Sequence, residues 1–183
     1  TLNTNSRGSR KEFPSVAVIV ATSTSVTIYD GDDSSLPMWM VFNQVSIYSS
    51  WTGGGYLWLN GDTHNTSVHM LNGMLTIGTA DNPTNNVCGV AIISFLAEYG
   101  KIYSAWGGGS IRTTTTPIST RNVANYYAVS SGTTIINSQV NDVAMTVLPN
   151  APIDAATGLP IPTIAVGTNG GVNVINNDGT IIN

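Results

Sequence analysis

Short apolar runs separated by turn residues follow one another along the whole chain. Runs such as VAVIVA and GVNVI are rich in β-branched residues, and Gly, Asn, Asp and Pro lie between the runs. The periodicity of an amphipathic helix is almost absent, and only GVAIISFLAEYGKIY fits a helix as well as a strand. The pattern therefore predicts an all-β protein built from short strands and tight turns.

Three stretches of the chain align with one another. They are VIVATSTSVTIYDGD from Val18, LTIGTADNPTNNVCGVAII from Leu75 and IAVGTNGGVNVINNDG from Ile164. Each contains a strand that ends in Gly or Ala plus Thr, then a turn, then a strand that begins with Ser or Gly and Val. We call the threonines at these strand ends the anchor threonines: Thr22, Thr79 and Thr168.

The alignment predicts one repeated unit, an antiparallel meander. Residues 66–70 and 141–145 supply a strand upstream of the second and third stretches. We expect residues 18–21, 75–78 and 164–167 to be equivalent strands, because a kept motif at irregular spacing is typical of a repeat with loop insertions. Alternate positions should face the core, which predicts that the following side chains are buried: Val18, Val20, Ile77 and Val166.

The last residues predict a hairpin with an open edge. NNDG is a strong hairpin signal, so residues 180–182 should pair with the preceding strand. An edge strand without Lys, Pro or a bulge recruits further strands. We therefore expect a neighbouring copy, or the remainder of a longer chain, to cover an assembly edge that comprises Gly171, Val172, Val174, Ile181 and Ile182.

Two longer blocks carry a resemblance to a known family. KEFPSVAVIVATSTSVTIYDGDDSSLPMWMVF and NDVAMTVLPNAPIDAATGLPIPTIAVGTNGGVNVINNDGT resemble β-propeller-like segments of phage tail-fibre-like proteins, and the repeat resembles the blades of sensor-type propellers. The two blocks cover under half of the chain. Residues 1–12 are polar and predict an N-terminal arm, and residues 13–183 predict a single all-β domain. The resemblance implies that this domain is the first part of a longer propeller. The alternative is a β-sandwich subunit completed by strand exchange.

The resemblance also implies a function. It predicts a non-enzymatic structural or binding module of a phage tail fibre or similar surface assembly, with copies of itself, other virion subunits or surface glycans as partners. The alternatives are a self-assembling extracellular filament subunit joined by strand complementation, and a polysaccharide-cleaving enzyme.

Composition is consistent with a virion or extracellular location. Only 9% of the residues are charged, the net charge is −4, and Ser, Thr, Asn and Gly abound. A phosphate backbone requires clustered Lys and Arg, so nucleic acid is not an expected partner. The apolar runs are too short to insert into a membrane. Cys88 is the only cysteine, which excludes an intrachain disulfide and thiol zinc sites.

One turn gathers carboxylates. YDGDDSS places Asp30, Asp32 and Asp33 close together, and oxygen ligands at close spacing suit Ca²⁺. Val41 stands where a helix-loop-helix calcium loop requires Glu. We prefer an Asp-Gly hairpin turn with solvated carboxylates and no metal or other cofactor, and we keep Ca²⁺ as the alternative.

Aromatic residues beside triple glycines suggest sugar binding. Trp51, Tyr56 and Trp106 have this context, and rings on glycine-flanked loops stack on sugar faces. The alternative is that they are core residues, which we prefer for Trp58. The sequon at Asn65 is a candidate glycan acceptor, although we prefer an unmodified polar loop.

Enzymatic signals are few. Glycoside hydrolysis needs two carboxyl groups at a defined separation, and besides Glu12 and Glu98 the chain has only eight Asp, most of them in turns. His64 and His69 are separated by five positions, and Cys88 lies at the edge of an apolar strand, where a buried residue is expected. The sequence therefore favours a protein that is not an enzyme.

Overall fold

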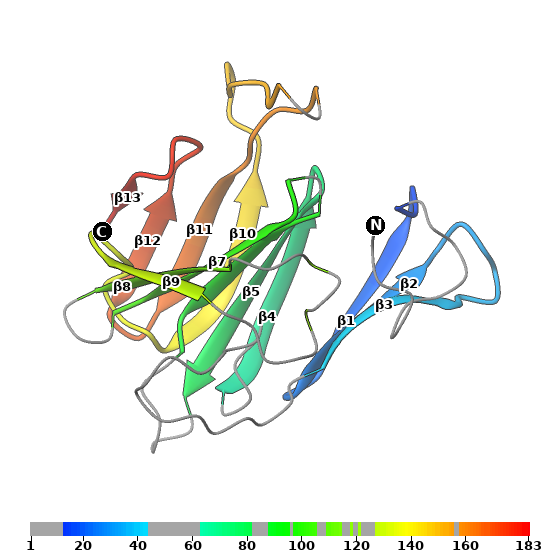
Figure 1. Cartoon of the computed structure of the whole chain (residues 1–183), viewed down its shortest axis with the longest axis horizontal. Helices are drawn as coiled ribbons and strands as arrows, with labels where there is room; N and C mark the ends of the chain where they lie inside the picture. The colour runs from blue at the N-terminus through cyan, green and yellow to red at the C-terminus, as the bar shows by residue number, and fades with distance from the viewer. Residues whose placement is uncertain are drawn as a thin grey trace.

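The structure is a computed structural model of the chain, and it contains thirteen strands and no α-helix within the residues that it describes (Figure 1). The described residues are 13–43, 63–81, 88–95, 97–105, 109–114, 118, 121, 127–155 and 158–183. The strands are β1 (Ala17–Ala21), β2 (Ser25–Asp30), β3 (Met38–Asn43), β4 (Thr63–Leu71), β5 (Met74–Asp81), β6 (Val90–Ser94), β7 (Tyr99–Ser104), β8 (Ser110–Thr114), β9 (Tyr127–Ser131), β10 (Val140–Thr146), β11 (Thr163–Thr168), β12 (Gly171–Ile175) and β13 (Ile181–Ile182). The predicted all-β class is confirmed. None of the described residues forms a helix long and apolar enough to cross a membrane.

The strands form three antiparallel sheets. Sheet A has the order β1-β2-β3, sheet B runs in order from β4 to β9, and sheet C runs in order from β10 to β13. Every strand pairs with its neighbour in sequence, so each sheet is a meander, as predicted. The expected upstream strands are β4 and β10. The ambiguous stretch GVAIISFLAEYGKIY forms β6 and β7, joined by a tight turn in which Glu98 has a φ of 48°.

Sheet B lies between two hydrophobic cores. On one face, Leu75 and Ile77 of β5 pack with Trp39 and Phe42 of sheet A. On the other face, Val90 of β6 packs with the buried side chains of sheet C. Figure 1 shows β7, β8 and β9 crossing in front of sheet C, with sheet A on the opposite side of β4. Successive side chains of a strand point to opposite faces, and this alternation explains why β5 and β6 are buried on both faces.

The three anchor threonines close three similar hairpins. The hydroxyl of each donates to a backbone carbonyl oxygen where the second arm of the hairpin begins. Thr22 donates to Ser25, the first residue of β2, at 3.4 Å, and Thr168 donates to Gly171, the first residue of β12, at 2.8 Å. Thr79 donates to Gly89, which directly precedes β6, at 2.9 Å. The hairpins are β1–β2, β5–β6 and β11–β12. The aligned segments thus occupy the same position in equivalent hairpins, as the sequence predicts.

The predicted burial is correct in two hairpins and wrong in the first. Ile77 and Val166 are fully buried, whereas Val18 and Val20 are 40% and 43% exposed. Strand β1 is the edge of sheet A, and its other face, which carries Ile19, packs against the core. Because the run VAVIVA is apolar on both faces, its sequence does not show which face is turned inward.

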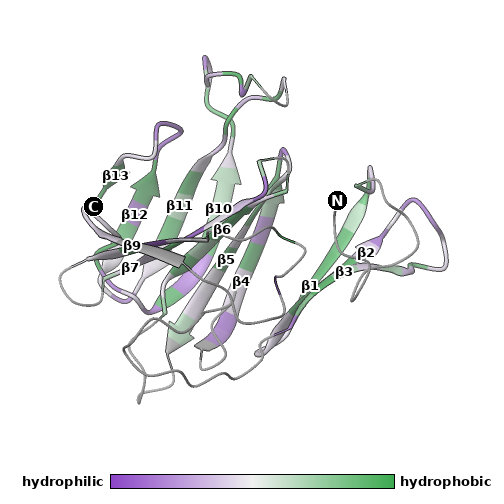
Figure 2. Cartoon of the chain, viewed as in Figure 1, coloured by the Kyte–Doolittle hydropathy of each residue, from purple (hydrophilic) through white to green (hydrophobic). Residues whose placement is uncertain are grey.

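The C-terminal hairpin is present as predicted. The amide of Asn176 donates to the carbonyl of Thr180 at 2.8 Å, and the amide of Gly179 donates to the carbonyl of Asn176 at 2.9 Å. The last strand, β13, is shorter than expected and comprises only Ile181–Ile182, paired with β12. Figure 2 shows hydrophobic colour on β11 and β12 and hydrophilic colour in the turn between β12 and β13.

Candidate functional site

Sheet C carries two rows of residues that we call its outer face. Strand pairing places one row across all four strands and a second row across three. Paired residues project from the same side of a sheet, and the opposite side of sheet C faces the core shared with sheet B. The first row is Ala144, Ala165, Val174 and Ile182, and the second is Asp142, Gly167 and Val172.

The outer face is small, apolar and almost uncharged. Val172 is 64% exposed and Ile182 is 58% exposed. The only charged residue in the two rows is Asp142, whose carboxylate accepts hydrogen bonds from the Ser67 hydroxyl and the Val143 amide. These bonds and the nearby His69 lower the pKa of Asp142. The negative charge of Asp142 therefore lies at the edge of the outer face, next to Ser67 of sheet B.

The predicted assembly edge is divided between two faces. Val172, Val174 and Ile182 belong to the outer face, whereas Ile181 packs against the core between sheets B and C. Gly171 begins β12 with a φ of 130°, a conformation that L side chains rarely adopt. That a neighbour covers this edge stays a prediction.

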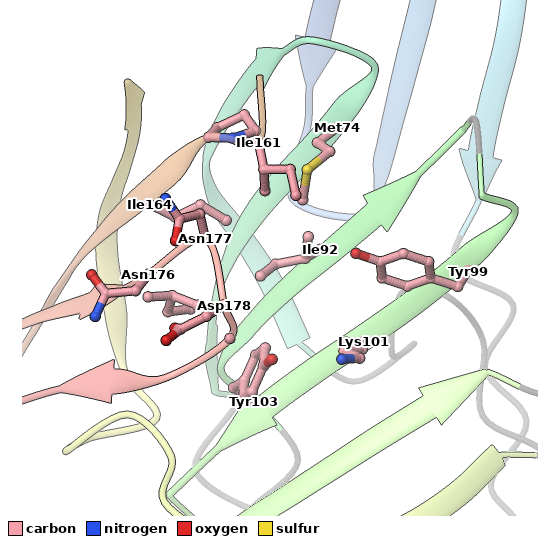
Figure 3. A pocket seen from close by; sticks show the side chains of 13 residues that line it. Met74, Ile92, Tyr99, Lys101, Tyr103, Ile161, Ile164, Asn176, Asn177 and Asp178 are labelled. Atoms are coloured by element: carbon pink, nitrogen blue, oxygen red, sulfur yellow. The ribbon is translucent and has the colours of Figure 1, made fainter. Parts of the chain in front are cut away.

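A groove lies between sheet B and the C-terminal hairpin (Figure 3). Its main lobe has a volume of about 150 Å³, and an adjoining lobe of about 120 Å³ shares Met74, Tyr99, Ile161, Pro162 and Asn177 with it. Strand β7 supplies the floor and the turn at residues 176–179 supplies the opposite wall. The floor residues alternate along β7, so they share one face: Tyr99, Lys101 and Tyr103.

Three ionisable groups of the groove have shifted pKa values. Burial raises the pKa of Tyr99 and that of Tyr103 above 10.0, and the charge of Asp154 raises the pKa of Tyr99 further. Both phenols therefore keep their protons at neutral pH. The hydrogen bonds from the side chain and amide of Thr180 lower the pKa of Asp178, so its carboxylate is ionised. The Lys101 ammonium lies 5.7 Å from the centre of the Tyr99 ring.

The three aspartates that the sequence offers as an alternative Ca²⁺ site accept hydrogen bonds within the protein. Asp32 accepts hydrogen bonds from the amides of Ser15 and Val16, Asp30 accepts one from the amide of Asp32, and Asp33 accepts two from Ser35. These bonds are those of a structured turn. Within the described part of the chain, no three His, Cys, Asp or Glu residues gather as metal ligands.

The predicted glycan contacts all lie outside the described residues. Trp51, Tyr56 and Trp106 lie there, as do Trp58 and Glu12, so the structure does not place this set and it stays a prediction.

Asn65 lies in β4 and is part of a contact between sheets. Its Nδ2 donates to the carbonyls of Thr22 and Ser25 at 3.0 and 3.3 Å. A glycan would replace one of the two amide hydrogens, so at most one of these bonds would remain. This geometry favours the unmodified side chain.

The candidate nucleophile and bases are apart. Cys88 is buried, as expected, and Gln139 contacts its sulfur at 3.6 Å. His64 is exposed on β4, and His69 lies on the opposite face of that strand from Val68 and Met70. No hydrogen bond joins either histidine to the thiol among the described residues.

No family model matches the chain, and no significant match was found among curated proteins or solved structures. The outer face and the groove are therefore interpreted from their own chemistry.

Proposed function

We propose that the chain is a non-enzymatic structural module of a surface assembly, such as a phage tail fibre, and that copies associate through the outer face of sheet C. The observation that carries this proposal is the row Ala144, Ala165, Val174 and Ile182, which crosses the whole sheet in register. The resemblance to tail-fibre segments supports a role in a surface assembly. The geometry of the row supports association through the outer face of sheet C.

The second copy is favoured as the occupant because the outer face is compatible with itself. A two-fold contact sets one patch against the same patch of its partner, and facing like charges would oppose the contact. Here the rows contain one charge, at the margin, and small side chains that allow two sheets to pack about 10 Å apart. Val172 and Ile182 would lose their exposure to water in that contact.

The groove chemistry supports a function without catalysis. A glycosidase acid needs a raised pKa, so that it holds a proton at working pH. The Asp178 carboxylate in the groove has a lowered pKa instead, because Thr180 donates two hydrogen bonds to it. It therefore suits a fixed acceptor better than a proton donor.

Sedimentation velocity over a range of protein concentrations tests the proposal. The native chain should form dimers or larger species as concentration rises. Val172→Lys should remain a monomer, because the partner copy would bring a second lysine to the contact. Val18→Lys is the matched control, since Val18 is an exposed strand valine of sheet A, and it should associate like the native chain. A native chain that stays monomeric, or equal loss in both variants, would contradict the proposal.

A further inference from the structure

The groove presents polar groups that the protein leaves unpaired. Within the described residues, four groups have no hydrogen-bond partner: the Tyr99 and Tyr103 hydroxyls, the Lys101 ammonium and the Asn177 side-chain amide. All four residues line the main lobe, and Asn177 and Tyr99 also line the second. Converging polar groups in a concave, partly apolar site are the usual mark of a small-molecule site.

Apolar surface lies between these polar groups. Met74 and Ile92 come from β5 and β6, and Ile161 and Pro162 come from the loop that precedes β11. Figure 3 shows Ile92, Lys101 and Tyr103 on one side of the groove and Asn176 and Asp178 on the other. A ligand in this space therefore meets aliphatic side chains as well as donors and acceptors.

The turn wall is held in place before any ligand binds. Asp178 Oδ1 accepts hydrogen bonds from the amide and hydroxyl of Thr180 at 2.8 and 2.6 Å. Asn176 Nδ2 donates to the same hydroxyl at 2.9 Å. These bonds leave Asp178 Oδ2 and the Asn177 side chain for a ligand, and a preorganised wall lowers the entropic cost of binding.

The charges favour a neutral polyhydroxylated ligand. Among the described residues, Lys101 is the one cation that lines the main lobe, and the carboxylates of Asp178 and Asp154 lie on the opposite wall and in the adjoining lobe. A phosphate or sulfate would meet both negative charges. Sugar hydroxyls donate and accept, so they match carboxylate, ammonium, phenol and amide alike, and the C–H face of a sugar ring suits Ile92 and Met74.

The size of the groove agrees with one sugar unit. The main lobe has a volume of about 150 Å³ and the adjoining lobe one of about 120 Å³, below the roughly 300–1,000 Å³ of sites for drug-sized ligands, so the groove fits only a small ligand. We propose that this groove binds one neutral pyranose unit of a glycan, with its hydroxyls contacting Tyr99, Lys101 and Asn177. The site is distinct from the outer face of sheet C, so it does not depend on the proposed association.

Nuclear magnetic resonance titration of the ¹⁵N-labelled chain tests this inference. The probes are the methyl glycosides of glucose, galactose, mannose and N-acetylglucosamine, with inorganic sulfate as the anionic comparison. At least one glycoside should cause saturable shifts at the amides of residues 99–103 and 176–179. Shifts with none of the glycosides, or tighter binding of sulfate than of every glycoside, would overturn the inference.

Variants separate the groove from a general effect on the fold. Asn177→Ala and Tyr99→Phe should each weaken glycoside binding about tenfold, as expected for the loss of one hydrogen bond to a ligand. Asn141→Ala is the control, because Asn141 is exposed on β10 and does not line the groove. The amide spectrum of each variant shows whether it is folded. Unchanged affinity in both groove variants would place the glycoside elsewhere.

Discussion

The hydroxyl of Thr79 bridges both backbone groups of Gly89. It donates to the carbonyl oxygen at 2.9 Å and accepts from the amide at 2.9 Å. Thr22 makes the same pair of contacts with Ser25, at 3.4 and 3.0 Å. The same device therefore closes a hairpin in sheet A and another in sheet B, although the intervening loops differ in length.

The Thr79 bridge should contribute measurably to stability. Thr79→Val keeps the β-branched shape but leaves the buried Gly89 amide without this acceptor, so we expect a loss of about 1–3 kcal/mol in the free energy of unfolding. Thr22→Val is the control, because Thr22 is exposed and water replaces its hydroxyl. Urea denaturation measures both. Equal losses would show that burial does not determine how much the threonine hydroxyl contributes to the free energy of unfolding.

Ile77 and Val20 occupy equivalent positions of the repeat but different environments. Ile77→Ala should cost about 2–5 kcal/mol, because Ile77 is fully buried between sheets A and B and its truncation leaves a cavity. Val20→Ala should cost less than about 1 kcal/mol, since Val20 is 43% exposed. Thermal unfolding of the two variants checks the difference. A larger loss for Val20→Ala would contradict the packing described here.

Gly89 is a position that only glycine fits. A Cβ there would lie 2.0 Å from the carbonyl oxygen of Tyr103, and its φ of 155° is one that L side chains rarely adopt. Gly89→Ala should therefore lose about 3 kcal/mol or more, or fail to fold. Gly132→Ala should be tolerated, because its nearest contact would be Ile111 Cδ1 at 3.4 Å. The yield of folded protein and its unfolding curve distinguish the two.

Acidification should weaken the contact between Asp142 and Ser67. The folded state lowers the pKa of Asp142 below 3.8, mainly through the Ser67 hydrogen bond. Its stabilising contribution is complete above the pKa of the unfolded chain, and it is lost as the pH falls through the lower value of the folded state.

Asp142→Asn removes this titration. Its melting temperature should decline less than that of the native chain between about pH 5 and pH 2. Parallel curves for the two proteins across that range would show that the Asp142 carboxylate makes no contribution to acid sensitivity.

The sequence predicts the strands and turns well because local signals define them. The structure contains the hairpins closed by the anchor threonines, the NNDG turn and the strands that begin at the Gly or the Val of a Gly-Val pair, as the sequence predicts. Burial in the first repeat was not predictable from the sequence. Val18 and Val20 lie on one face of β1 and Ile19 lies on the other, so both faces are apolar. The face that carries Ile19 is the one that packs against the core shared with sheet B.

The groove was not predicted because distant segments build it. Met74, the β7 residues and the turn at residues 176–179 meet only after sheets B and C have packed. The one local signal is the alternation of Tyr99, Lys101 and Tyr103, which puts three polar side-chain ends on one face of a strand. The outer face of sheet C was predictable in part, since Val172, Val174 and Ile182 stand at alternate positions of their strands.

Site-specific cross-linking tests most directly whether copies associate through the outer face of sheet C. The only native cysteine, Cys88, is buried, so an introduced cysteine is the sole exposed thiol. With a short thiol-reactive cross-linker, Val172→Cys and Ile182→Cys should give covalent dimers at concentrations where the native chain associates. Val18→Cys, on sheet A, should associate like the native chain but give no covalent dimer. Equal cross-linking of Val18→Cys, or an absence of covalent dimers from both sheet C variants in a sample that associates, would contradict the account.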